Sequence, residues 1–211
     1  LLHAATMVKA GIYLLSRFIL IFAAAPALIE ALMPVWFPTI AWVGVITAFI
    51  GATLALMTTD IKGVLAYSTV SQIGFMMAGL GTALSGHVTD VSLSTGWFAS
   101  LFHMMSHAFF EGLGFLLAGG IIHALGTRDM RLMGGLKKAM PITFALAIIM
   151  IITTSGLPPF ASFFSKGLII TSVMETGNLI QTVLIFITTA LTFAYCIRMF
   201  SLVFMGKPSE H

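Results

Sequence analysis

Long apolar runs, each about as long as a membrane-spanning helix, dominate the pattern of hydrophobic and polar positions along the chain. A transmembrane helix needs about 20 predominantly apolar residues. Successive runs of roughly that length therefore predict an all-helical, polytopic membrane protein with about six transmembrane helices. The runs fall near Leu2–Ala25, Ile40–Met57, Val64–Leu84, Trp97–Ile122, Pro141–Val173 and Leu179–Met205.

The fifth run is too long for one straight span, and its middle contains two consecutive prolines, Pro158 and Pro159. Proline removes a backbone donor and clashes with the preceding turn, so the helix is expected to break here. In a membrane, such a break is tolerated where the freed carbonyls face protein or a wet cavity. A simple proline kink is the alternative, but Gly156 and the hydroxyl residues before it favour a true discontinuity near 156–159.

Composition supports a membrane location. Hydrophobic residues make up 59% of the chain and charged residues 8%, whereas soluble domains carry roughly 25% charged residues. The net charge of +3 comes from scattered basic residues, so a lipid bilayer rather than a nucleic acid is the expected partner. The single cysteine, Cys196, excludes a disulfide within the chain and any CxxC motif. We expect no cofactor site and no metal site in this chain.

The loops between the spans differ in charge. If six spans alternate, one side collects every loop Lys and Arg, whereas the other collects only acidic residues and a histidine. This asymmetry predicts that loops 58–63 and 124–140 lie on the cytoplasmic side of the membrane. The basic set is Lys62, Arg128, Arg131, Lys137, Lys138 and Lys207, and the opposite set is Glu30, His87, Asp90 and Glu175.

Three titratable residues, His103, His107 and Glu111, are spaced four residues apart within the fourth apolar run. On a helix they share one face. A charged residue inside a membrane helix costs roughly 2.5–3.5 kcal/mol on insertion scales, so three on one face indicate that protons or ions use them. Imidazole exchanges protons near neutral pH, which favours a proton relay. A metal site without the HExxH order and interhelical packing remain as alternatives.

Four further charged residues are candidates for the same pathway. Lys166 follows the expected helix break by about two turns, where we expect it to face a hydrated cavity, and the alternative is a lysine that snorkels to the interface. Lys9 lies within the first apolar run. Asp60 and Lys62 begin the third run, where a helix-start acid with an interfacial lysine is the alternative.

Several ordered segments resemble one family of membrane proteins. They are similar to the antiporter-like subunits of respiratory complex I, especially the largest one, and to their relatives in multisubunit sodium/proton antiporters and membrane-bound hydrogenases. The segments are HAATMV (3–8), GIYLLSRF (11–18), TDIKGVLAYSTVSQIGFM (59–76), FHMMSHAFFEGLGFLLAGGIIHA (102–124), MGGLKK (133–138), SGLPPFASFFSK (155–166) and FMGKP (204–208).

The resemblance implies a fold of two inverted five-helix repeats, each with a broken helix. Residues 1–25 resemble the eighth helix of the family and residues 38–205 the second repeat, helices nine to thirteen, within one transmembrane domain, 1–211. The chain opens inside an apolar run without an initiator Met, so we expect the first repeat to be missing from this sequence.

The resemblance also implies roles for individual residues. By this resemblance, the residues that match the family's proton pathway are Lys62, His103, His107 and Lys166. His3, on the segment that resembles the eighth helix, is a further match. Two positions depart from the family. Glu111 stands where the family usually has lysine, and Lys9 stands where a small or hydroxyl residue is common, so we expect Lys9 to compensate the charge of Glu111.

The expected function is proton translocation within a complex I-like respiratory oxidoreductase in an energy-transducing membrane. The redox cofactors would belong to partner membrane and redox subunits, because no flavin, iron–sulfur or quinone motif is present in the chain. A subunit of a sodium/proton antiporter or of a membrane-bound hydrogenase is the alternative within the family. A structural scaffold, whose polar residues only lock helices together, is the alternative outside it.

Overall fold

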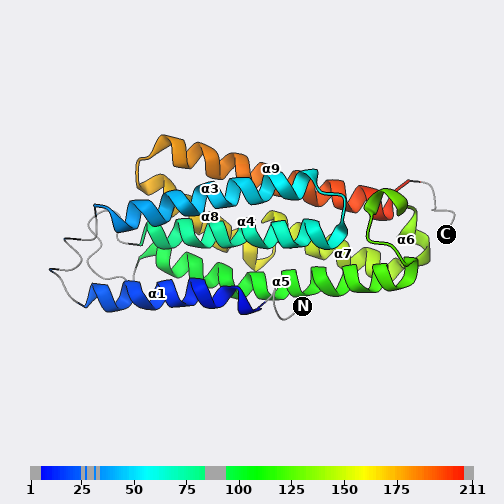
Figure 1. Cartoon of the computed structure of the whole chain (residues 1–211), viewed down its shortest axis with the longest axis horizontal. Coiled ribbons are helices and arrows are strands. Elements are labelled where there is room, and N and C mark those ends of the chain that lie inside the picture. Colours follow the sequence, from blue (N-terminus) through cyan, green and yellow to red (C-terminus); the bar gives the residue numbers. More distant parts are fainter. Residues whose placement is uncertain (1–5, 25–26, 28–30, 32–33, 84–93, 207–211) are drawn as a thin grey trace.

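The computed structural model describes residues 6–24, 27, 31, 34–83 and 94–206, and its regular elements are helices that run side by side along one long axis (Figure 1). In chain order they are α1 (Lys9–Ala23), α3 (Trp36–Met57), α4 (Ile61–Gly81), α5 (Thr95–Leu125), the short 3₁₀ helix η3 (Met130–Leu132), α6 (Leu136–Ala139), α7 (Pro141–Ser155), α8 (Ala161–Glu175) and α9 (Leu179–Phe204).

Four of these helices, α3, α4, α5 and α9, are long and apolar enough to cross a membrane, and α7 is a shorter apolar helix. The predicted all-helical, polytopic membrane fold is therefore confirmed. The boundaries differ from the apolar runs in one instructive way. Helix α3 begins at Trp36 rather than Ile40, because Pro38 occupies its first turn, where the missing N–H has no intrahelical partner to lose.

The predicted interruption of the fifth run is also present. Helix α7 ends at Ser155, Gly156 adopts a left-handed conformation with φ 74°, and α8 begins at Ala161. A left-handed C-terminal residue is the usual site of a glycine, because it has no Cβ to clash. Helices α7 and α8 together thus form one broken helix.

Helices α3 and α4 pack through small residues. Gly44 and Gly74 face the backbone of the opposite helix so closely that a Cβ at either position would overlap Ala78 or Ala48. The Ser71 hydroxyl donates to the Ala48 carbonyl across this contact, with 2.9 Å between the oxygens. Small residues let membrane helices approach closely, since lipid supplies no hydrophobic force between them. This contact holds α4 in the centre of the bundle.

The basic loops lie together at one end of the bundle. Asp60 caps the N-terminus of α4 through the backbone N–H groups of Lys62 and Gly63, and its other oxygen is 2.7 Å from the Arg128 guanidinium. In the same loop the Arg131 guanidinium hydrogen-bonds Asp129 and holds the pKa of that carboxyl below its ordinary value. Loops 58–63 and 124–140 therefore share one end, as the alternating spans predict.

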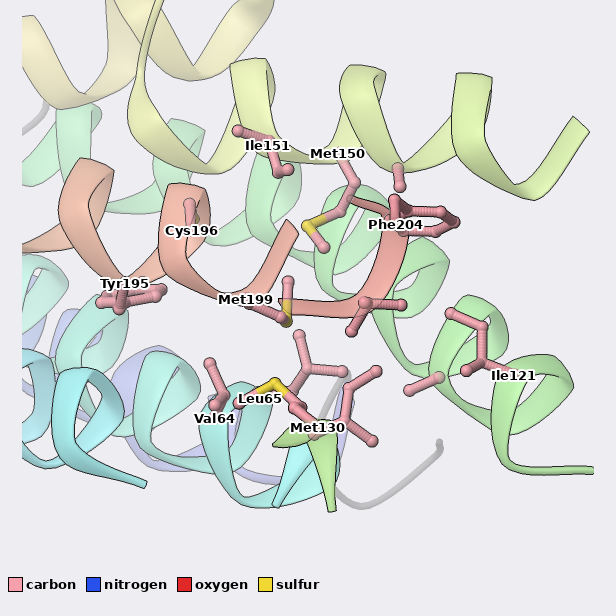
Figure 2. Packing of buried hydrophobic residues seen from close by; sticks show 14 of the residues in the cluster. Val64, Leu65, Ile121, Met130, Met150, Ile151, Tyr195, Cys196, Met199 and Phe204 are labelled. Atoms are coloured by element: carbon pink, nitrogen blue, oxygen red, sulfur yellow. The ribbon is translucent and has the colours of Figure 1, made fainter. Parts of the chain in front are cut away.

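The largest apolar cluster fills the bundle near that end, between α4, α5, α7 and α9. Figure 2 shows the side chain of Met199 lying toward those of Val64 and Leu65, and that of Phe204 lying toward Met150 of α7. Flexible methionine side chains fill irregular gaps well. A cavity of about 20 Å³ remains among these residues, which is room for about one water molecule.

Candidate functional site

The three titratable residues of the fourth run lie on α5 and are buried together. His103 and His107 are 0% exposed and Glu111 is 1% exposed. Because α4 and α8 pack against α5, the column faces the interior of the bundle. We call this set, His103, His107 and Glu111, the polar column.

Glu111 is held by a hydroxyl of α4. The Thr69 hydroxyl lies 2.7 Å from Glu111 Oε1 and 3.0 Å from the Leu65 carbonyl. A hydroxyl has one proton to donate and lone pairs to accept. Thr69 therefore donates to one of these oxygens at a time, or accepts from Glu111 when that carboxyl is protonated.

His107 lies between the other two members of the column. Its Nε2 is 3.6 Å from Glu111 Oε2, which is longer than a hydrogen bond. Among the described residues neither of its ring nitrogens has a hydrogen-bond partner. The His107 ring lies edge-on to Phe110, with centroids 5.0 Å apart, and 6.3 Å from the ring of His103. A side-chain movement that shortens the 3.6 Å separation would join His107 to Glu111.

His103 makes two hydrogen bonds to other helices. Its Nε2 is 3.0 Å from Gln72 Oε1 on α4, and its Nδ1 is 2.9 Å from the Ser165 hydroxyl on α8. Because a carbonyl oxygen only accepts, Nε2 carries the proton and Nδ1 accepts from Ser165. A second proton at Nδ1 would turn the same contact into a donation from the ring to Ser165.

Lys166 folds back onto the broken helix. Its side chain is 2% exposed, and its ammonium donates to the Thr154 carbonyl at 2.9 Å while lying 4.9 Å from the centre of the Phe75 ring. Thr154 is in the last turn of α7, where carbonyls have no intrahelical donor. The break thus supplies a carbonyl for a buried cation, at the negative end of the helix dipole. The lysine faces protein rather than lipid.

Lys9 of α1 reaches the same region from the outside. It is 6% exposed and lines a groove of about 320 Å³ with Met104 and Ala108 of α5, among other residues. Glu111 lies one turn beyond Ala108 on the same face of α5. That Lys9 compensates the charge of Glu111 stays a prediction.

The structure does not bring every candidate into this interior. Lys62 is exposed in the first turn of α4, about two turns from Thr69 along the helix. Asp60 is occupied as a helix cap and as the partner of Arg128, which fits its structural alternative. His3 lies outside the described residues. A pathway role for these three stays a prediction.

Sequence reasoning missed the polar side chains that position the column, namely Thr69, Gln72 and Ser165. Their signal was the polar cluster within the third apolar run and the serine beside Lys166. Hydroxyl and amide groups are common packing residues in membrane helices, so that signal is weak without a structure. In the described part of the chain there is no group of three His, Cys, Asp or Glu residues that could hold a metal ion.

Taken together, the site is a series of proton donors and acceptors rather than a binding pocket. Thr69 hydrogen-bonds Glu111, whose Oε2 is 3.6 Å from His107 Nε2, and Gln72, His103 and Ser165 form a second hydrogen-bonded group. Lys166 on α8 and Lys9 on α1 are further buried titratable residues near this series. Such an arrangement can accept, hold and pass protons.

Comparison with known proteins places the chain in one family of membrane proteins. The family model for the transmembrane part of NADH:quinone oxidoreductases and Mrp antiporters matches residues 1–192. The chain is 41% identical to a subunit of the Na⁺/H⁺ antiporter of Alkalihalophilus pseudofirmus, over 98% of this chain and 26% of that protein. It is 40% identical to NAD(P)H-quinone oxidoreductase chain 5 of a Picosynechococcus species, over 98% of this chain and 29% of that protein.

One solved structure has a similar fold over nearly the whole chain. One chain of the membrane-bound sulfane sulfur reductase, an archaeal respiratory membrane complex, superposes with a TM-score of 0.85 and 33% identity, over 98% of this chain and 33% of that one. The chain thus spans about a quarter to a third of each of these three proteins.

Proposed function

We propose that the chain, which belongs to the NADH:quinone oxidoreductase/Mrp antiporter transmembrane family, carries protons across the membrane along the polar column and Lys166. The observation that carries this proposal is the burial of His103, His107 and Glu111 on one face of a membrane-spanning helix. Ionisable residues within a membrane are rare and usually mark an ion or proton pathway.

The geometry suggests how the protons move. A proton on His103 Nδ1 can pass to Ser165, and one on His107 can pass to Glu111 once their 3.6 Å gap closes. When Glu111 is ionised, it and Lys9 have no net charge together. A proton on Glu111 leaves the positive charge of Lys9 alone, so each transfer changes the field felt by the neighbouring histidines.

We propose that the working unit is a multisubunit complex in an energy-transducing membrane, in which other subunits hold the redox centres and this chain holds none. The similarity to NAD(P)H-quinone oxidoreductase chain 5 and to one chain of a respiratory complex supports this. The basic loops 58–63 and 124–140 are proposed to face the cytoplasm, since positive loops generally stay there.

The second candidate function is that of a subunit in a sodium/proton antiporter. The sequence identity to the Na⁺/H⁺ antiporter subunit is as high as the identity to the oxidoreductase chain. The two functions differ in what drives the protons. Proton movement driven by an imposed sodium gradient without an electron donor would favour the antiporter. Proton movement that requires electron transfer and ignores sodium would favour the oxidoreductase.

The experiment is Glu111→Gln in the complete complex, reconstituted into sealed vesicles with a pH-sensitive dye inside. Glutamine keeps the size and hydrogen-bonding capacity of the side chain but cannot titrate. We expect normal assembly and a lower number of protons moved per electron or per sodium ion. The wild-type ratio in this variant would contradict the proposal, and the structural-scaffold alternative would then be the better account of the column.

A further inference from the structure

A tyrosine hydroxyl of the apolar cluster binds the helix that holds the partners of the polar column. Tyr195 on α9 is 2% exposed and belongs to that cluster, and Figure 2 shows its ring on the side of α9 that faces α4. Its hydroxyl donates to the hydroxyl of Ser68, a buried residue of α4, with 2.9 Å between the oxygens. A buried tyrosine usually satisfies its hydroxyl in this way, and here the hydrogen bond joins α9 to α4.

Ser68 is close along α4 to both residues through which this helix holds the polar column. Thr69, the next residue, lies 2.7 Å from Glu111 Oε1. Gln72, one turn further along, lies 3.0 Å from His103 Nε2. Successive side chains of a helix point about 100° apart, so α4 presents one position to α9 and the next to α5. Within little more than one turn, α4 is therefore hydrogen-bonded to both of these helices.

The packing of α4 against α3 does not by itself fix the rotation of α4. The close contact between these two helices runs through Ser71, Gly74 and Ala78 on one side of α4, and Thr69 lies on nearly the opposite side. A contact along one line allows a helix to roll about that line, and such a roll would move Thr69 relative to Glu111. A hydrogen bond to a third helix, at an angle to the first contact, opposes the roll.

We infer that Tyr195 is a positioning residue, which holds α4 at the rotation that places Thr69 against Glu111. It acts through its hydrogen bond to Ser68, and its phenol transfers no proton in this role. This inference rests on the proposed function, because the placement of Thr69 affects proton movement only if Glu111 carries protons.

The test compares Tyr195→Phe with the wild type in the complete complex, in the vesicle assay used for Glu111→Gln. Phenylalanine keeps the ring in the apolar cluster, and the Ser68 hydroxyl can turn to a carbonyl of its own helix, so we expect normal assembly. We expect the rate of proton movement to fall by about two- to tenfold, the change that one net hydrogen bond makes in an equilibrium. Ser68→Ala should lower the rate similarly, and the double variant should lower it no further than either single variant.

Infrared difference spectra of the same variants distinguish positioning from packing. A protonated carboxyl group absorbs at a different wavenumber when a hydrogen bond to it is lost. We expect the Glu111 band of Tyr195→Phe to shift in the same direction as that of Thr69→Val, which removes the bonding hydroxyl itself. In a Thr69→Val background, Tyr195→Phe should cause no further shift.

Two control variants remove hydroxyls of α4 that lie outside this contact. Tyr67→Phe changes an exposed tyrosine beside Ser68. Ser71→Ala removes the hydroxyl that faces α3, where the close approach of the two backbones does not depend on it. Both variants should move protons at the wild-type rate once assembled and should leave the Glu111 band unshifted.

The outcomes separate the positioning role from the proposed function. If either the rate or the band of Tyr195→Phe matches the wild type while Glu111→Gln moves fewer protons, the positioning role is wrong and the function of the column stands. A lower rate with an unshifted band would in that case assign the Tyr195 hydroxyl to packing alone. If Glu111→Gln is itself unimpaired, the proposed function fails and the positioning role fails with it.

Discussion

Glu111 and Lys9 are opposite charges placed in the interior from two different helices. Removing one member of a buried charge pair leaves the other without its counter-charge, which destabilises more than removing both. We expect Lys9→Met alone to lower the unfolding temperature of the purified complex, and Lys9→Met with Glu111→Gln to recover part of that loss. A coupling of about 0.5–3 kcal/mol is typical of interacting neighbours. Strictly additive effects in this double-mutant cycle would contradict the pairing.

Lys166 has a structural task as well as a proposed functional one, because its ammonium binds the Thr154 carbonyl at the helix break. Lys166→Ala should therefore reduce proton movement more than it reduces the amount of assembled complex. Vesicle assays normalised to the assembled protein measure the two effects separately. Lys138→Met, at an exposed lysine of α6, is the control. An equal fall in assembly and in proton movement would assign Lys166 to structure alone.

At the scale of residues, the spacing of His103, His107 and Glu111 was enough to predict one buried column, because four-residue spacing fixes a helix face. The partners of the column were not predictable. Thr69 and Gln72 come from another helix, and a sequence does not state which faces of two helices meet. The proposed pathway residue Lys62 illustrates the same limit, since its exposed position follows from where α4 begins.

At the scale of elements, the close contact of α3 and α4 sets the position of the column's partners on α4. We expect Gly74→Val to weaken this contact by about 1–3 kcal/mol or more, because the added side chain would overlap the Ala48 backbone. Thermal unfolding of the purified protein measures the change. Gly112→Ala is the control, because nothing lies within 4 Å of a Cβ at that position. Equal stability of the two variants would contradict the packing described here.

The helices themselves followed from the apolar runs, and the double proline correctly indicated the interruption between α7 and α8. The apolar runs did not predict which side chain contacts the carbonyls at that interruption. The structure adds the contacts of Lys166, whose ammonium lies against Thr154 and Phe75, and a hydrated cavity at this lysine stays a prediction. A lysine side chain can fold back across such a break only if α8 is placed suitably relative to α7. That placement belongs to the tertiary structure, and the apolar runs do not determine it.

At the scale of the whole molecule, the bundle has one basic end, where Asp60 and Arg128 join two loops. We expect single cysteines placed in 127–138, in a Cys196→Ala background, to react with impermeant thiol reagents only from the cytoplasmic side. The reaction is measured on intact cells and on inverted vesicles. Labelling of intact cells would contradict the proposed orientation.

The central claim is that Glu111 takes up and releases a proton while the complex works. Infrared difference spectroscopy of the complete complex during turnover measures this directly, because a carboxyl group gains a characteristic carbonyl stretching band when it is protonated. We predict a carboxyl band in the wild-type difference spectrum that is absent from Glu111→Gln and unchanged in the Ser71→Ala control. Identical carboxyl bands in the wild type and in Glu111→Gln would contradict the account, because Glu111 would then keep one protonation state throughout.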